Sequence, residues 1–205
     1  MHYSIIIPIY NKKNNILKLI SRIQYYLKSI KFEILVIDDD SNDGTKGLFK
    51  KIKLKKNVKF IIRKDKPRDL TQSVFLGINN SKNKNLIIMD GDLQHNPKYL
   101  PKICKIFSQN KIDLLICVRN FKNRSGLSIL RFFSSVFLIK FINLILGYKS
   151  SDPMSGFFVF KKKIFNKRKL YPYGFKILLS LIYSSNRKIN INEFQNKFNK
   201  RQNNK

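Results

Sequence analysis

Acidic residues are scarce in this chain of 205 residues, which has 12 aspartates and glutamates against 42 lysines and arginines. Four of the acids fall within residues 38–43, and two more flank Gly91 in the string Asp90-Gly91-Asp92. Carboxylates one residue apart in an extended turn can face the same side, where a hard divalent cation can join them to a diphosphate. Gln94 adds a neutral oxygen. We therefore expect Asp90, Asp92 and Gln94 to hold Mg²⁺ or Mn²⁺, which would neutralise charge on a departing nucleotide diphosphate.

The elements that must position these acids follow from the alternation of short apolar runs with helical patterns. We predict strands over residues 4–7, 33–37, 58–63, 86–89 and 114–118. Helices are expected over residues 16–30, 45–52, 69–78 and 97–110. Pro8 should end the first strand, and Asp69 should cap the third helix. Strands that alternate with helices indicate an α/β fold, with a mostly parallel, Rossmann-like sheet covered by helices on both faces.

Ligands of such sheets bind beyond the carboxyl ends of the strands. The loops that contain residues 8–11, 38–43 and 90–92 should therefore converge. The chain has neither GxGxxG nor GxxxxGK[ST], which excludes a Rossmann dehydrogenase and a P-loop NTPase. A capping role for the acids of 38–43 is compatible with ligand binding there.

The net charge of +30 indicates an anionic partner, which could be a nucleic acid, an acidic membrane surface or a phosphorylated substrate. The lysines are spread along the whole chain, so a generally basic surface explains the charge equally well. Two lone cysteines, Cys104 and Cys117, exclude a disulfide scaffold and a zinc ribbon. We expect both thiols to be buried and inert.

The most apolar stretch covers residues 127–148, but Arg131 and Lys140 interrupt it. Two cations inside a membrane span would be costly, so we expect amphipathic helices and no transmembrane helix. These helices would either lie at a membrane interface or pack as a core pair. No targeting segment is visible at the start of the chain.

Several strings of residues resemble glycosyltransferase family 2, and more narrowly the dolichol- or polyprenol-phosphate mannosyltransferases. They are Pro8-Ile-Tyr-Asn11, the acidic segment 36–45, Asp90-Gly-Asp-Leu-Gln-His95, Asp152-Pro-Met-Ser-Gly-Phe-Phe158 and Gly174-Phe-Lys-Ile-Leu178. The resemblance covers nearly the whole chain. It implies a single GT-A domain over 1–205, with a nucleotide-binding half (1–93), an acceptor-side half (94–193) and a flexible basic tail (194–205).

The resemblance also implies an inverting, metal-dependent transfer of a hexose, first of all mannose from GDP-mannose, to a polyprenyl or dolichyl phosphate. It assigns the nucleotide-sugar to Pro8, Tyr10, Ile37, Asp39, Asp90, Gly91, Lys176 and Arg201. It assigns the catalytic and acceptor-phosphate roles to Asp92, Arg119, Arg131 and Ser135. Arginine suits a phosphate because its planar fork forms paired, charge-assisted hydrogen bonds.

Other readings remain open from the sequence. A relative using UDP-glucose, or a glycan hydroxyl as acceptor, would carry the same motifs. Lys12 stands where the family has an acidic residue, which would fit a catalytically degenerate relative. A basic nucleic-acid-binding protein ranks low, because acidic loops at strand ends repel phosphates unless a metal intervenes.

The expected partners are therefore the nucleotide-sugar, the polyprenyl phosphate and the cytoplasmic face of a membrane, with no nucleic acid. On this reading the chain is a cytoplasmic, peripheral membrane protein. A membrane-anchoring partner protein would supply the spans that many bacterial relatives carry themselves.

Overall fold

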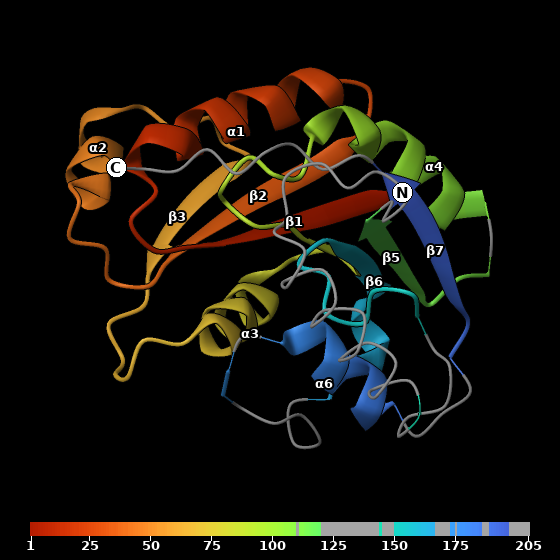
Figure 1. Ribbon diagram of the computed structural model, residues 1–205. Helices are drawn as coiled ribbons and strands as arrows, with labels where there is room; N and C mark the ends of the chain where they lie inside the picture. The colour runs from red at the N-terminus through yellow and green to blue at the C-terminus, as the bar shows by residue number, and fades with distance from the viewer. Residues whose placement is uncertain are drawn as a thin grey trace, which may run out of the picture.

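The computed structural model shows one mixed sheet with helices on both faces (Figure 1). It describes residues 1–109, 111–119, 144, 150–166, 173–174, 176–185 and 189–196, and the backbone alone of Arg119. The strands are β1 (His2–Ile9), β2 (Lys31–Asp38), β3 (Val58–Ile62), β4 (Asn85–Ile88), β5 (Leu114–Arg119), β6 (Phe158–Lys161) and β7 (Ile191–Asn196). The helices are α1 (Lys13–Tyr26), α2 (Thr45–Lys51), α3 (Leu70–Asn80), α4 (Leu100–Gln109) and α6 (Ile177–Ser184), with short 3₁₀ turns η1 (Pro97–Tyr99) and η2 (Lys162–Ile164).

The sheet confirms the predicted α/β class. Within the described residues its order is β3-β2-β1-β4-β6-β5-β7, and β6 is antiparallel to both of its neighbours. The remaining strands are parallel to one another, so β1, β2, β4, β5 and β7 all end at one edge of the sheet. We call this the carboxyl edge. The antiparallel β6 begins at the same edge, because Phe158 pairs with Ile88 of β4.

Two apolar layers hold the helices on the sheet. Ile5 and Ile7 of β1 pack with α1 and α4 on one face, and Ile6 packs with α3 and α6 on the other. Figure 1 shows the same division, with α1, α2 and α4 on one side of the sheet and α3 and α6 on the other. This alternation is the period of two that a strand buried on both faces requires.

The first strand is longer than predicted, because Pro8 lies inside β1 and pairs with Ile37 of β2. Successive carbonyls of a strand point to opposite sides. The carbonyl of Ile6 accepts a hydrogen bond on the side of β1 that faces β4, and the carbonyl of Ile9 accepts one on the side that faces β2. The missing N–H of Pro8 therefore faces the β4 side, where the ladder has already ended at Ile6 and Ile88. Proline is tolerated there because no ladder bond is lost.

The C-terminal part also differs from the prediction. Residues 194–196, assigned from sequence to a flexible tail, form the end of β7, where Phe194 and Asn196 are buried. These residues pair with β5 in a parallel ladder, and a local sequence pattern does not predict a partner so distant in the chain. Residues 197–205 and most of 127–148 lie outside the described residues.

Both cysteines are buried, as predicted. Burial raises the pKa of the Cys104 thiol to about 12 and that of Cys117 well above its ordinary value. A thiol with so high a pKa carries almost no nucleophilic thiolate at neutral pH, so neither cysteine is a reactive group.

Candidate active site

Three loops meet at the carboxyl edge, as the sequence predicts: one after β1, one after β2 and one after β4. Each loop contains one residue in the left-handed region, namely Asn11 (φ 53°), Asp40 (φ 59°) and Leu93 (φ 64°). Within the described residues these are the only non-glycine residues with positive φ. Such conformations cost energy and persist where surrounding contacts hold them, which is typical of functional loops.

The loop after β1 is hydrogen-bonded to the loop after β2. The backbone N–H of Asn11 donates to Ser41 Oγ over 2.8 Å, and the N–H of Asn42 donates back to Asn11 Oδ1 over 3.0 Å. Ser41 in turn donates its hydroxyl and its N–H to the carboxylate of Asp38. Burial raises the pKa of Asp38, and the hydrogen bonds from Ser41 offset part of that rise. Asp38 therefore stabilises the loop from within.

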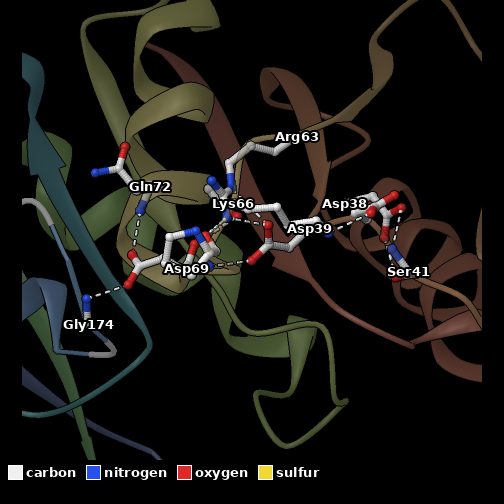
Figure 2. A network of polar contacts seen from close by, with 11 residues as sticks. Asp38, Asp39, Ser41, Arg63, Lys66, Asp69, Gln72 and Gly174 are labelled. Carbon is white, nitrogen blue, oxygen red and sulfur yellow. Dashed lines mark hydrogen bonds and ion pairs between the residues drawn. The ribbon is translucent and has the colours of Figure 1, made fainter.

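Asp39 is held by a buried arginine (Figure 2). Its Oδ1 lies 2.8 Å from Nε and 2.6 Å from Nη2 of Arg63, and the exposed fractions of the two side chains are 8% and 4%. Arg63 Nη2 also donates to the carbonyl of Pro67 over 2.8 Å. The second oxygen of Asp39 accepts the N–H of Asp69 over 2.7 Å. Both oxygens of Asp39 are thus used by the protein itself, which offsets the cost of burying the charge.

The two outer acids of this loop are also matched. Asp40 pairs with Lys46 and, over 2.7 Å, with Lys66, and these hydrogen bonds hold the pKa of Asp40 well below its usual range. Burial pushes the pKa of Asp43 upward, but hydrogen bonds from Thr45 and from the N–H of Lys13 outweigh it and leave that pKa lowered. The loop after β2 therefore carries acids that have cationic or N–H partners.

The loop after β4 leaves a carboxylate toward solvent. The side chain of Asp90 is 37% exposed, and its Oδ2 lies 3.1 Å from Nε2 of the buried His95. Asp92 is buried, and its Oδ1 accepts the N–H of Gln94 over 3.0 Å. Within the described residues Asp90 has no lysine or arginine in an ion pair. Its charge is therefore accessible to a ligand.

The turn before β6 packs directly on Asp90. A Cβ atom at Gly156 would overlap Oδ2 of Asp90 and would lie 2.8 Å from its Cγ. The neighbouring Ser155 fixes this turn to β5, since its hydroxyl donates to the carbonyl of Cys117 over 2.7 Å. Glycine at 156 thus leaves room for the close approach of the Asp90 carboxylate, which any larger residue would displace.

The donor set fits a divalent cation shared with a bound diphosphate. Asp90, Asp92 and Gln94 supply two carboxylates and an amide, all hard oxygen ligands that suit Mg²⁺ or Mn²⁺. Within the described residues no three His, Cys, Asp or Glu side chains gather into a metal site. Mg²⁺ usually takes one or two carboxylates from the protein and its other oxygens from phosphates and water. The types of donor that these three residues supply meet that pattern.

The predicted nucleoside residues lie along the same edge. Pro8 and Ile37 are paired neighbours at the ends of β1 and β2, and Gly91 follows β4. Tyr10 is exposed, with the guanidinium of Arg68 4.6 Å from its ring centroid. The structure thus brings these residues to one edge, and their contact with a nucleoside stays a prediction.

The predicted acceptor and diphosphate residues are described only in part. Arg119 ends β5 at the carboxyl edge, and Lys176 is exposed at the N-terminus of α6. Arg131, Ser135 and Arg201 lie outside the described residues, as does the side chain of Arg119. Within the described residues, no helix combines the length and apolar content needed to cross a membrane.

Three contacts of the site were not predicted from the sequence. Arg63 pairs with Asp39, Gly156 packs on Asp90, and Gly174 binds Asp69. Sequence offered a signal for two of them, because Gly156 and Gly174 stand within strings that resemble the family. Nothing in the sequence singled out Arg63 among so many cations.

Comparison with solved structures identifies the fold. The fold matches glucosyl-3-phosphoglycerate synthase from Mycobacterium tuberculosis in complex with phosphoglyceric acid, with a TM-score of 0.73 and 15% identity over 99% of this chain and 72% of that one. A complex of the same synthase with Mn²⁺, UDP-glucose and phosphoglyceric acid gives a TM-score of 0.71 at 15% identity, over 94% of this chain and 69% of that one. The chain has the GT-A fold of glycosyltransferases.

The sequence comparison then gives the family. Residues 4–169 match glycosyl transferase family 2, and the chain belongs to that family. It is 33% identical to the dolichol-phosphate mannosyltransferase of Pyrococcus furiosus, over 89% of this chain and 52% of the relative. It is 31% identical to that of Saccharomyces cerevisiae, over 89% of this chain and 70% of the relative. The chain thus spans about half the length of the archaeal protein.

A third relative differs in the sugar that its name gives. The dodecaprenyl-phosphate galacturonate synthase of Rhizobium johnstonii is 26% identical, over 83% of this chain and 51% of the relative. All three names contain a lipid phosphate, whereas two of them give mannose and the third gives galacturonate.

Proposed function

We propose that this protein transfers a hexose from a nucleotide-sugar to a polyprenyl phosphate, with inversion, and that the donor is GDP-mannose. One observation carries the proposal: Asp90 is an exposed carboxylate at the carboxyl edge, beside Asp92 and Gln94, in a chain that matches lipid-phosphate mannosyltransferases over 89% of its length. The lipid phosphate is supported by all three relatives. The sugar is supported by two of them.

The residues divide into three groups by role. Asp90, Asp92 and Gln94 would hold the divalent cation, which would supply positive charge to offset that of the donor diphosphate. Pro8, Tyr10, Ile37 and Gly91 line the nucleoside together with Asp39, whose carboxylate is held in place by Arg63 and the N–H of Asp69. Lys176 and Arg201 meet the donor diphosphate. Arg119, Arg131 and Ser135 hold the acceptor phosphate.

In the reaction, an oxygen of the lipid phosphate forms a bond to the anomeric carbon as the bond from that carbon to the nucleoside diphosphate breaks. The phosphate is already ionised near neutral pH, so no general base is needed and the protein supplies position and charge. The acids of the loop after β2 support this assignment. Asp38 and Asp39 accept hydrogen bonds from Ser41, Arg63 and Asp69, which leaves neither poised as a base for a sugar hydroxyl.

Because its acceptor is a membrane lipid, the protein would work at a membrane surface, as a peripheral protein on the cytoplasmic face. Residues 127–148 are proposed to contact the lipid, and a partner protein would provide any further anchoring. A second candidate keeps the acceptor and changes the donor to a UDP-sugar such as UDP-glucose. The galacturonate synthase supports a donor sugar other than mannose, since that relative shares the lipid phosphate without mannose in its name.

The test uses purified protein with Mn²⁺ or Mg²⁺, polyprenyl phosphate, and labelled GDP-mannose or UDP-glucose in parallel reactions. We expect label from GDP-mannose to move into the organic phase, and to stay in water when EDTA is added or when Asp92→Asn replaces the wild type. Asp113→Asn is the matched control, because Asp113 pairs with Lys161 and Lys163 at the opposite edge of the sheet.

Transfer from UDP-glucose alone would replace the donor and keep the reaction. Transfer that persists after EDTA is added would contradict the proposed dependence on a divalent metal. No transfer from either donor to the lipid would contradict the proposed function.

A further inference from the structure

Gly174 is bound to the first turn of α3 by three hydrogen bonds. Its N–H donates to Asp69 Oδ2 over 2.5 Å, and its carbonyl accepts from the N–H and the hydroxyl of Thr71 over 3.1 and 2.8 Å. Gly174 and Asp69 are 105 positions apart in the sequence. Gly174 has φ +112°, which an L side chain rarely adopts, so this docked backbone suits glycine.

The same carboxylate serves two other purposes. Asp69 Oδ1 accepts the N–H of Gln72 and so caps α3, as predicted, while the backbone N–H of Asp69 donates to Asp39. Figure 2 shows Asp69 between Asp39 on one side and Gly174 on the other. A continuous path of hydrogen bonds therefore runs from the loop after β2, through the N-terminus of α3, to Gly174.

Helix capping alone does not account for this arrangement. One carboxylate oxygen suffices to cap α3, and Asp69 uses its second oxygen on a segment distant in sequence. Packing of α6 does not account for it either. That helix is buried against the sheet through Leu178 and Leu181, which lie in the same apolar cluster as α3. The bonds to Gly174 thus fix the entry into α6.

The docked entry into α6 leads directly to Lys176. This lysine lies two residues after Gly174, at the N-terminus of α6, and its side chain is exposed. Two residues of chain span at most about 7 Å, so the backbone of Lys176 is confined close to the docked glycine. A flexible approach to α6 would let the ammonium group sample many positions, and ordering it at the moment of binding would cost affinity.

We propose that Asp69 and Thr71 are positioning residues, which hold Gly174 and thereby place Lys176 beside the donor diphosphate. The inference rests on the proposed function, since that function gives Lys176 its ligand. It goes further, because it assigns the placement of Lys176 to residues that do not touch the donor.

Two substitutions weaken the docking of Gly174 and change little else in the structure. Asp69→Asn keeps a residue that caps helices as well as aspartate does, but leaves one acceptor for the N–H groups of Gln72 and Gly174. Thr71→Val keeps the shape and the backbone N–H and removes the hydroxyl donor to Gly174. Ser73→Ala is the control, because the Ser73 hydroxyl is buried in the same helix and donates to the carbonyl of Asp69 instead.

The measurement is the affinity for GDP and for UDP in the presence of Mn²⁺, by titration calorimetry, in a double-mutant cycle with Lys176→Met. We expect Lys176→Met to weaken binding about tenfold, the size of one charge-assisted contact. Asp69→Asn should weaken it about fivefold in the wild type and less than about twofold in the Lys176→Met background. Thr71→Val should act in the same direction, and Ser73→Ala should not change the affinity.

Hydrogen exchange gives an independent readout. The amide of Gly174 should exchange faster in Asp69→Asn than in the wild type or in Ser73→Ala, since it has lost its acceptor. Faster exchange with unchanged nucleotide affinity would overturn the positioning role. Effects of Asp69→Asn and Lys176→Met that multiply would also overturn it, as would a wild type that binds neither nucleotide. A wild type that binds a nucleotide but transfers no sugar would contradict the proposed function and leave the cycle interpretable.

Discussion

Asp39 in the loop after β2 and Asp90 in the loop after β4 are carboxylates at the same edge of one sheet, but their surroundings differ. Asp39 is 8% exposed and is enclosed by Arg63 and the N–H of Asp69, whereas Asp90 is 37% exposed. The nearest partner of Asp90 is the ring of His95, and Gly156 leaves room for its carboxylate. The loop after β2 uses the charge of Asp39 to hold itself together, and the loop after β4 leaves the charge of Asp90 accessible from solvent. An acidic motif in the sequence does not distinguish these two roles, because the groups around each carboxylate in the folded protein decide its role.

The largest effect on stability should come from breaking the buried pair. Arg63→Met leaves the carboxylate of Asp39 buried without its cation, which should lower the free energy of unfolding by about 3–5 kcal/mol. Urea denaturation measures the loss. Adding Asp39→Asn to Arg63→Met should recover part of it, because the unpaired charge is then gone. If the single variant unfolds at the same urea concentration as the wild type, the pair is not what stabilises this loop.

Asp90→Asn should have the converse effect, with a large loss of turnover and little loss of stability. We expect sugar transfer to fall at least about 100-fold, since charge neutralisation by the cation is worth several kcal/mol in the transition state. The free energy of unfolding should change by no more than about 0.5 kcal/mol, as for an exposed substitution. A variant that loses stability instead would show that Asp90 is structural like Asp39, and the contrast between the loops would fail.

Gly156→Ala should act on the site through Asp90. Its methyl group would overlap the Asp90 carboxylate, so the carboxylate must move. We expect the Mn²⁺ concentration for half-maximal activity to rise about tenfold, as is usual when the support of a metal ligand is disturbed. Gly47→Ala is the control, since nothing lies within 4 Å of a Cβ there. Equal responses of the two variants would show that Asp90 is not held in place by this turn.

The smallest expected effect is on how stability depends on pH, where Asp38 and Asp40 of the loop after β2 should act in opposite directions. The pKa of Asp40 is lowered by Lys46 and Lys66, so its carboxylate favours the folded state. That contribution is complete above the unfolded pKa of about 3.9 and falls as the pH drops toward the folded value. The pKa of Asp38 is raised by burial, so its contribution is complete below about pH 3.9 and is lost as the pH rises through the folded value.

Denaturation of Asp40→Asn and Asp38→Asn between about pH 3 and about pH 6 measures these slopes. The stability of the wild type relative to Asp40→Asn should grow with pH, and that relative to Asp38→Asn should shrink. Slopes of the same sign would contradict the different surroundings of the two carboxylates.

The sequence predicts the scaffold of the site well. Alternating apolar runs gave the parallel strands, and the acids at their ends placed Asp38 and Asp90 at one edge. The cap at Asp69 was also predictable, because a cap is formed with residues three positions away. These are local patterns, set by backbone geometry and by the side chains of neighbours in the chain.

Other elements depend on partners that are distant in sequence. The antiparallel β6 has four residues and the edge strand β7 is mostly polar, and both are held by ladders, β6 with β4 and β5 and β7 with β5. Pro8 is inside a strand because the neighbouring ladder ends at Ile88. Very short or mostly polar strands have weak propensity signals, and tertiary pairing decides them.

The sequence by itself thus determined the fold class, the edge at which the acids gather and the residues that resemble a sugar transferase. Only the tertiary structure decided which acids are neutralised by the protein and which remain for a ligand. The physical reason is that a buried charge is governed by the groups within a few ångströms of it. Those groups arrive from elsewhere in the chain: Arg63 for Asp39, Gly156 for Asp90 and Gly174 for Asp69.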